Sequence, residues 1–266
     1  MVTQSRDKTP EHKAFREMVR AFVKNELAPR AREFDQMGRL DKSLFPKMGE
    51  LGMLGLRYDE KYGGAGLDWT YTAILCEELG RADNVGVMTG ISVHTDMATP
   101  ALHRFGSEEL KQKYLVPAIR GETVSAIAVT EPDAGSDVAG IRTRAVRDGD
   151  DWVINGSKMY ITNAATADWL CLLAVSDPEA GHAGFTQIIV PTDTPGFSVS
   201  KKLDKLGMRA SDTGLLSFDD CRVPVANTIG EIGRGFQQQM AQFVVERMWG
   251  AYSVVGAGEI ALERTA

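Results

Sequence analysis

The segment from Ala128 to Gly140, which reads AVTEPDAGSDVAG, contains residues that suit the binding of a phosphate group. Gly135 has no side chain, so another group can approach its backbone closely, and Ser136 adds a hydroxyl beside it. Asp, Pro, Gly and Ser are also ordinary turn formers, so composition alone leaves a plain turn as an equal alternative.

Three carboxylates, those of Glu131, Asp133 and Asp137, lie in the same segment. Paired carboxylates can act as a general acid and a general base. On a turn, however, such groups are more often solvated or accept hydrogen bonds from nearby backbone amides. We therefore assign them no catalytic role.

A second group of candidate residues lies on a helical pattern that begins at Phe236 and runs to Ala266. A helical wheel places Arg247 near the middle of an apolar stripe and Glu246 on its flank. The stripe consists of Phe236, Met240, Phe243, Ala251 and Val254. A buried guanidinium needs an anion, and a carboxylate facing a cleft has its pKa raised by desolvation. The alternative is a structural ion pair or a solvated helix edge.

The elements that must position these residues change in type along the chain. Apolar residues recur at three- and four-residue steps through the first ~120 residues, which predicts helices. Ser107 is expected to cap one of these helices and Gly121 to close it. From Val124 onwards, short β-rich runs separated by turn residues predict a compact antiparallel β domain, and Asp148-Gly149 predicts a hairpin within it.

Composition excludes several classes of protein. A chain of 266 residues that is 43% hydrophobic with a net charge of -6 can form ordinary cores and has no basic surface for nucleic acid. Its 3 cysteines are too few and too far apart for a disulfide framework, and its 4 histidines lack the spacing of a zinc site, so we expect no metal. No secretory signal or membrane-spanning run is evident, so we expect a cytoplasmic protein.

The segment Ala128–Gly140 resembles the signature of the FAD-dependent acyl-CoA dehydrogenase family. Further segments similar to that family follow in the expected order, and they are KYGGAG (61–66), NGSKMYITNA (155–164), KLGMRASDT (205–213), FDDCRVP (218–224) and GEIGRGF (230–236). The resemblance covers nearly the whole chain. Its motif pattern is closest to the long-chain and isovaleryl-type members, in which the base is a Glu just before an Arg on the first C-terminal helix.

The resemblance implies an α+β fold of three parts. These are an N-terminal helical domain (1–122), a middle antiparallel β domain (123–233) and the first helix of a C-terminal helical domain (234–266). Because the pattern stops inside a helix that cannot bury its own apolar stripe, we expect the rest of a C-terminal bundle to be missing or a partner to cover the helix.

The resemblance also implies the site residues. The expected FAD-binding residues are Ile127, Ala128, Val129, Thr130, Gly135, Ser136, Tyr160, Ile161 and Thr162. Among these, the Thr162 hydroxyl is expected to donate to flavin N5, with Tyr160 flanking the ring. Glu246 is expected to be the catalytic base, and Ser136, Val244 and Arg247 are expected to bind substrate. Val244 departs from the family, because many members have Asp at that position.

The implied function is the FAD-dependent α,β-dehydrogenation of an acyl-CoA thioester to the trans-2-enoyl-CoA, in fatty acid metabolism. The implied partners are an electron-transfer flavoprotein and further copies of the chain, in a homotetramer or a dimer. Two alternatives stay open. One is an acyl-CoA oxidase or flavin monooxygenase of the same fold, and the other is a non-catalytic fragment or partner subunit.

Overall fold

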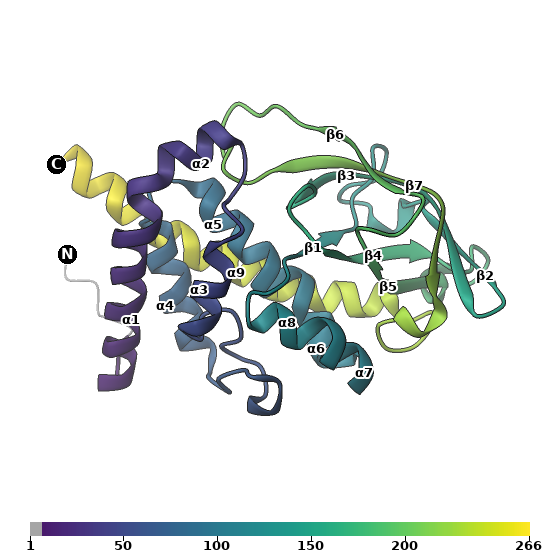
Figure 1. Ribbon diagram of the computed structural model, residues 1–266, viewed down its shortest axis with the longest axis horizontal. Coiled ribbons are helices and arrows are strands. Elements are labelled where there is room, and N and C mark those ends of the chain that lie inside the picture. Colours follow the sequence, from purple (N-terminus) through teal and green to yellow (C-terminus); the bar gives the residue numbers. More distant parts are fainter. Residues whose placement is uncertain (1–6) are drawn as a thin grey trace.

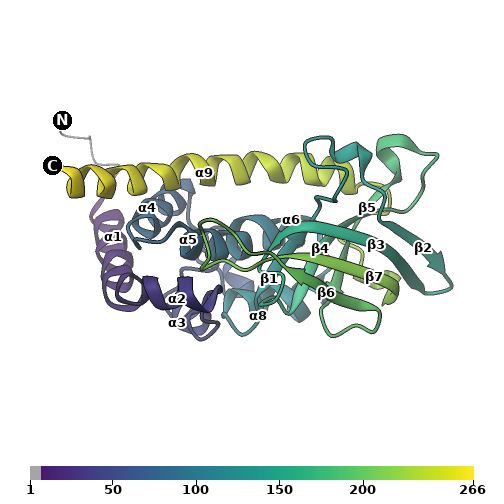
Figure 2. The same ribbon diagram turned by 90° about the horizontal axis from the view of Figure 1, so that it is seen from above.

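The computed structural model describes residues 7–266 and has a helical part, a curled β-sheet and one long helix that runs along both (Figures 1 and 2). The α-helices are α1 (Pro10–Phe22), α2 (Ala31–Met37), α3 (Leu44–Glu50), α4 (Trp69–Gly80), α5 (Val85–Ser92), α6 (Thr99–Phe105), α7 (Glu108–Leu110), α8 (Val116–Ile119) and α9 (Gly235–Thr265). Single helical turns of π type are η1 (Val23–Leu27), η4 (Val93–Ala98) and η5 (Lys111–Leu115), and those of 3₁₀ type are η2 (Ala28–Arg30), η3 (Glu60–Tyr62), η6 (Val138–Gly140), η7 (Gly181–Gly184) and η8 (Val225–Asn227). The strands are β1 (Ser125–Ala128), β2 (Arg144–Asp148), β3 (Asp151–Thr162), β4 (Trp169–Val175), β5 (Phe185–Pro191), β6 (Phe197–Lys202) and β7 (Thr213–Pro224).

Local sequence signals fix several of these boundaries. The Ser107 hydroxyl accepts a hydrogen bond from the Leu110 amide at 3.2 Å, which caps α7 as expected. Gly121 ends the same helical stretch with a φ of +73°, which glycine adopts without strain. The β2–β3 hairpin turns at Gly149, whose φ is +64°. All three predictions are confirmed.

The sheet has the strand order β1-β4-β2-β3-β7-β6, with β5 paired to β4. Four of its pairings are antiparallel, as the sequence predicts, but β1 runs parallel to β4 and β2 meets β4 in a short parallel contact. The β2–β3 hairpin follows β1 before the chain returns as β4, and this crossover allows the parallel direction. The ends of β1 and β4 are thereby brought side by side.

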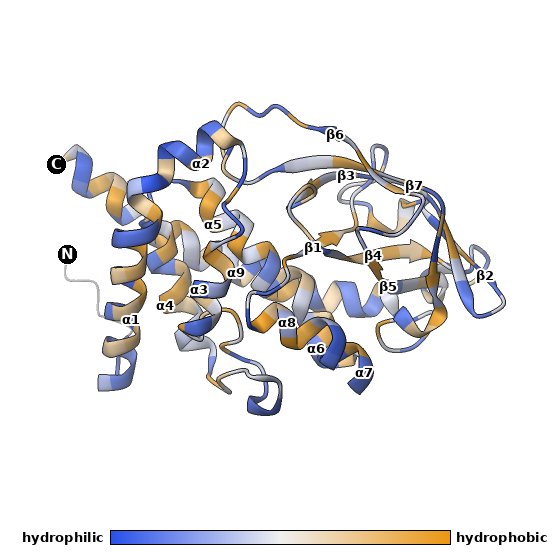
Figure 3. Ribbon diagram, viewed as in Figure 1, coloured by the Kyte–Doolittle hydropathy of each residue, from blue (hydrophilic) through white to orange (hydrophobic). Residues whose placement is uncertain are grey.

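Alternation along β4 divides its side chains between two cores. Trp169, Cys171 and Leu173 face the helices, whereas Leu170 and Leu172 pack into the opposite core with β3 and β7. Figure 3 shows many apolar residues along β1, β4 and α5. The helices around α9 therefore cover the face of the sheet that carries Cys171.

Helix α9 crosses α4 at a point where both helices have glycine. A Cβ added to Gly256 would lie 1.9 Å from the Glu77 carbonyl oxygen, and one added to Gly80 would lie 2.8 Å from the Ser253 carbonyl oxygen. The two backbones are in contact at this crossing, so no side chain fits between them. This close approach fixes the position of α9 over the rest of the molecule.

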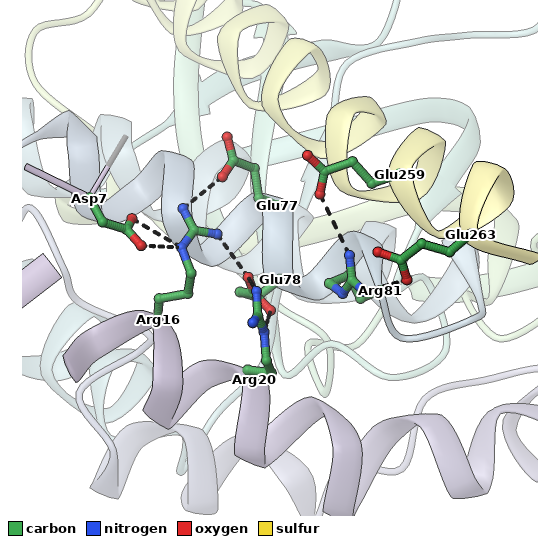
Figure 4. A network of polar contacts seen from close by, with 8 residues as sticks. All are labelled: Asp7, Arg16, Arg20, Glu77, Glu78, Arg81, Glu259 and Glu263. Atoms are coloured by element: carbon green, nitrogen blue, oxygen red, sulfur yellow. Dashed lines mark hydrogen bonds and ion pairs between the residues drawn. The ribbon is translucent and has the colours of Figure 1, made fainter. Parts of the chain in front are cut away.

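A network of ion pairs joins α1, α4 and α9 beside that crossing (Figure 4). Its members are Asp7, Arg16, Arg20, Glu77, Glu78, Arg81, Glu259 and Glu263. Arg16 lies 2.8 Å from Glu78 and 2.9 Å from Glu77, and Arg81 lies 2.7 Å from Glu263 on α9. Burial would raise the pKa of Glu78, but hydrogen bonds from Arg20 and Arg16 outweigh it and lower that pKa. Glu78 is therefore ionised, and its charge is compensated.

Within residues 7–266, no helix is long and apolar enough to cross a membrane, and no group of three or more His, Cys, Asp or Glu side chains is arranged to hold a metal ion. The three cysteines are buried free thiols that pack in the cores.

Candidate active site

The two segments expected to hold the flavin lie side by side in the structure. The Met159 amide of β3 donates a hydrogen bond to the Thr130 carbonyl at 2.8 Å, just beyond the end of β1. An irregularity in the β3–β7 register falls between Lys158 and Ile161, and Tyr160 has a φ of +61° within it. The bulge turns the Tyr160 side chain outward, to 61% exposure, while Ile161 stays in the core.

The expected cofactor residues differ in how far they are accessible. Ala128, Val129 and Ile161 are buried, Ile127, Thr130 and Thr162 are half-buried, and Gly135, Ser136 and Tyr160 are exposed. A Cβ added to Gly135 would meet nothing within 4 Å, so space is open around its backbone. An open edge with two threonine hydroxyls and an outward tyrosine fits a planar cofactor that needs hydrogen bonds at its rim.

A buried ion pair fixes the turn between these segments. Lys158 is fully buried, and its Nζ donates to the Val129 carbonyl and to Glu131 Oε1, both at 2.8 Å. Glu131 also accepts from the Arg142 and Thr143 amides, at 2.7 and 2.9 Å. Burial lowers the pKa of Lys158 to about 8, against the opposing effect of Glu131, so the lysine is still mainly protonated at neutral pH. The pair ties both predicted flavin segments together.

Helix α9 presents a different face to the protein from the one that the helical wheel suggested. Arg247 is exposed, with its guanidinium 5.5 Å from the centre of the Phe243 ring, so the prediction of a buried guanidinium is wrong. The packed positions instead recur at steps of three and four residues, and they are Gly235, Gln238, Gln239, Gln242, Trp249, Ser253 and Gly256. Glu246 lies on this packed face, four residues after Gln242, and not on a flank.

The wheel failed because it ranked positions by hydrophobicity alone. The stripe is correct at its start, where Phe236, Met240 and Phe243 pack against the apolar cluster around Val129. Further along, Val254 is 64% exposed. Close helix crossing favours small and polar residues there instead, because glycine permits contact that a larger side chain would prevent.

Glu246 is a carboxylate largely withdrawn from water. Its Oε1 atom is buried and has no hydrogen-bond partner among the described residues. Burial raises the pKa of Glu246 to about 7, with Arg247 opposing the change. Burial raises the pKa of the Cys171 thiol to about 12, and the Glu246 charge adds to this effect. Helix α9 contacts β4, and Cys171 of β4 pairs with Ile127 of β1, in the first of the predicted flavin segments.

Polar side chains continue from Glu246 toward β5. Gln187 Nε2 of β5 donates to Gln239 Oε1 at 3.0 Å and to Gln242 Oε1 at 3.3 Å. The Nε2 atoms of Gln239 and Gln242 are buried without a hydrogen-bond partner in the part of the chain that is described. The packed face of α9 therefore has buried amide groups in the two helical turns before Glu246.

Two other expected residues lie apart from this face. Val244 is 56% exposed, and Ser136 is exposed on the turn that follows β1. His94, in contrast, is fully buried and bonded to Ser125 Oγ and to the Ala118 carbonyl, both at 3.0 Å. Burial lowers its pKa to about 4, so His94 is a packed neutral residue.

Sequence reasoning missed the Lys158–Glu131 pair and the three glutamines. A signal for Lys158 was present, because it occupies an inward position in the alternation of β3, where a lone charge requires a partner. The glutamines gave no such signal, since polar residues on a helix are ordinarily solvated.

Comparison with known proteins agrees with this arrangement. Residues 9–122 match the family model of the acyl-CoA dehydrogenase N-terminal domain, and residues 126–221 match that of the middle domain. The chain is 40% identical over 258 residues to the probable acyl-CoA dehydrogenase YngJ of Bacillus subtilis, covering 96% of this chain and 67% of that protein. It is also 41% identical over 254 residues to the isovaleryl-CoA dehydrogenase of Solanum tuberosum, with 94% of this chain and 61% of that protein covered.

Among solved structures, the chain superimposes on the glutaryl-CoA dehydrogenase of Mycobacterium smegmatis in complex with FADH2 with a TM-score of 0.90 at 33% identity. That match covers 98% of this chain and 65% of the other. The chain thus spans about three-fifths to two-thirds of the length of the relatives it matches. With both domain models matched in order and such identity along its length, the chain belongs to the acyl-CoA dehydrogenase family.

Proposed function

We propose that this chain belongs to an enzyme that converts an acyl-CoA thioester to the trans-2-enoyl-CoA with FAD as cofactor. The chain would supply the base that abstracts the α-proton of the substrate. The proposal rests on Glu246, a half-buried carboxylate whose Oε1 atom is buried without a hydrogen-bond partner in residues 7–266 and whose pKa is raised to about 7. A general base is most effective when its pKa lies near the working pH. Glu246 would take the α-proton of the substrate.

FAD would supply the acceptor for the β-hydride. The residues proposed to hold it are the backbone of Ile127–Thr130 and the side chains of Tyr160 and Thr162. The hydrogen bond between Met159 and Thr130 supports this assignment, because it holds the two segments at a fixed separation. The Thr162 hydroxyl would orient the ring, and Gly135 and Ser136 would accommodate phosphate or thioester-arm atoms.

Arg247 and Val244 are proposed to contact substrate from the exposed side of α9. The exposed guanidinium of Arg247 follows Glu246 directly in the helix, so it is available to an anionic part of the substrate. We further propose that an electron-transfer flavoprotein accepts the electrons and that the protein works as a homo-oligomer, in a tetramer or a dimer.

The test is to mix the purified flavoprotein with acyl-CoA under anaerobic conditions and to measure reduction of the flavin as a loss of its absorbance. Wild type should be yellow and should bleach, whereas Glu246→Gln should stay yellow and should not bleach. Glu231→Gln is the matched control, because its side chain is 82% exposed, and it should behave as wild type.

Two outcomes would contradict the proposal. A Glu246→Gln variant that is still reduced would place the base elsewhere, and a colourless wild-type protein would favour a non-catalytic partner subunit. Rapid reoxidation by dioxygen after reduction would instead favour an oxidase or a monooxygenase.

A further inference from the structure

Two residues with a left-handed backbone lie on either side of Thr162 at the end of β3. Tyr160 has a φ of +61° and Asn163 has a φ of +62°. A positive φ is uncommon outside glycine, and it persists where surrounding contacts hold it, although asparagine tolerates it better than most residues. Tyr160 is 61% exposed, whereas Asn163 is 2% exposed. Of the two, Asn163 is therefore the residue that the protein interior can hold.

The Asn163 side chain joins the helical part of the molecule to the sheet. Its Nδ2 atom donates to the Gly90 carbonyl of α5 at 2.8 Å and to the Ser125 carbonyl of β1 at 3.4 Å. Ser125 is itself held from the helical side, because its amide donates to His94 Nδ1 at 3.1 Å. A Cβ added to Gly90 would lie 3.3 Å from Asn163 Oδ1, so glycine leaves room for this side chain. One asparagine thus fixes the end of β3 against both α5 and the start of β1.

The backbone of Asn163 is engaged as well. Its amide donates to the Asp212 carbonyl at 3.0 Å, and its carbonyl accepts from the Thr166 and Ala167 amides at 3.1 and 2.8 Å. A shift of this residue would break several hydrogen bonds at once and leave buried polar groups without partners, which is costly. Asn163 is therefore a fixed point at the end of β3.

Thr162, in contrast, depends on its neighbours for its position. Its backbone pairs with Thr213 of β7, but its hydroxyl makes no hydrogen bond within residues 7–266. The hydroxyl is thus available to a ligand. Because no bond of its own holds it, its place follows that of the backbone on either side.

We propose that Asn163 is a positioning residue that acts through Thr162. Its two side-chain hydrogen bonds hold the Thr162 hydroxyl at a fixed place relative to the backbone of residues 127–130. Both of these groups contact FAD in the proposed function, on which this inference rests. Asn163 is buried and would not touch the cofactor, so its effect on the reaction would come from where it places Thr162.

The test variant is Asn163→Gly, because glycine adopts a positive φ without strain and the substitution removes only the side-chain contacts. Asp220→Gly is the matched control. Asp220 also has a positive φ, of +46°, and its carboxylate accepts a hydrogen bond from Asn155 Nδ2 at 2.9 Å. It is exposed, and Asn155 lies toward the other end of β3 from Thr162.

The first measurement needs no cofactor. Hydrogen–deuterium exchange of the amides in residues 161–167 should be roughly 10- to 100-fold faster in Asn163→Gly than in wild type, because the loss of these hydrogen bonds eases local opening. Exchange in the same residues should be unchanged in Asp220→Gly. Unaltered exchange in Asn163→Gly would overturn the inference, since the side chain would then not hold this segment.

The second measurement uses the FAD-loaded protein. Asn163→Gly should retain FAD by absorbance, shift the reduction potential of the flavin in the same direction as Thr162→Ala, and slow flavin reduction by acyl-CoA roughly 10-fold. In the Thr162→Ala background it should cause no further loss, because it acts through that hydroxyl.

An unshifted potential, or losses that multiply in the double variant, would overturn the inference. If acyl-CoA does not reduce the wild-type flavin, the proposed function fails. The exchange rates and the flavin potential then still decide the role of Asn163, because neither requires turnover.

Discussion

Replacing Glu246 with glutamine should make the protein more stable at alkaline pH while removing its activity. The amide has nearly the shape of the neutral carboxyl and cannot ionise, so the substitution isolates the cost of a buried charge. In the wild type, burial raises the pKa of Glu246 from 4.5 to about 7. An acid whose pKa is higher in the folded state stabilises that state at low pH and loses this contribution as pH rises through the folded pKa.

The magnitude follows from the two pKa values. One pKa unit corresponds to about 1.4 kcal/mol, so the full penalty of ionising the buried group is about 3 kcal/mol. At pH 5 the folded carboxyl is neutral and the penalty is below about 1 kcal/mol, whereas at pH 8 nearly all of it applies. The free energy of unfolding of the glutamine variant, relative to that of wild type, should therefore increase by about 2 to 3 kcal/mol from pH 5 to pH 8.

The assay is urea unfolding of both proteins at pH 5 and pH 8, followed by circular dichroism, with Glu231→Gln as the exposed control. The rate of flavin reduction in wild type should rise with pH through about 7, as the base loses its proton. An equal difference in stability at both pH values would refute the reasoning, because Glu246 would then not be desolvated.

Three further predictions concern structure and cofactor. Lys158→Met leaves Glu131 as an uncompensated buried charge and should lower the free energy of unfolding by about 3–5 kcal/mol in urea titrations, with partial recovery on adding Glu131→Gln. Gly256→Ala should lower the melting temperature clearly, because its Cβ would lie 1.9 Å from a carbonyl oxygen of α4, whereas Gly258→Ala, with nothing within 4 Å, should not. Thr162→Ala should slow flavin reduction in stopped flow yet retain FAD by absorbance; an unchanged rate would contradict its assignment.

Local features of this protein could be predicted from its sequence because they depend on neighbouring residues. Ser107 caps α7 through a hydroxyl three residues from its partner, and Gly149 turns the hairpin through its own backbone freedom. The order of helices, strands and the final helix follows from the same short-range periodicity. The family signature likewise lies in one continuous segment, so no contact has to be known to recognise it.

Only the tertiary structure shows the features that depend on contacts between segments far apart in the sequence. The direction of β1 against β4 and the pairing of Lys158 with Glu131 join residues far apart in the chain. The side of α9 that is buried was likewise set by its crossing with α4, where glycine lets two backbones touch. Arg247 is exposed, contrary to what the hydrophobic stripe indicated, whereas the raised pKa of Glu246 agrees with the sequence prediction. Burial is a property of two surfaces that meet, and the sequence of one helix describes only one of them.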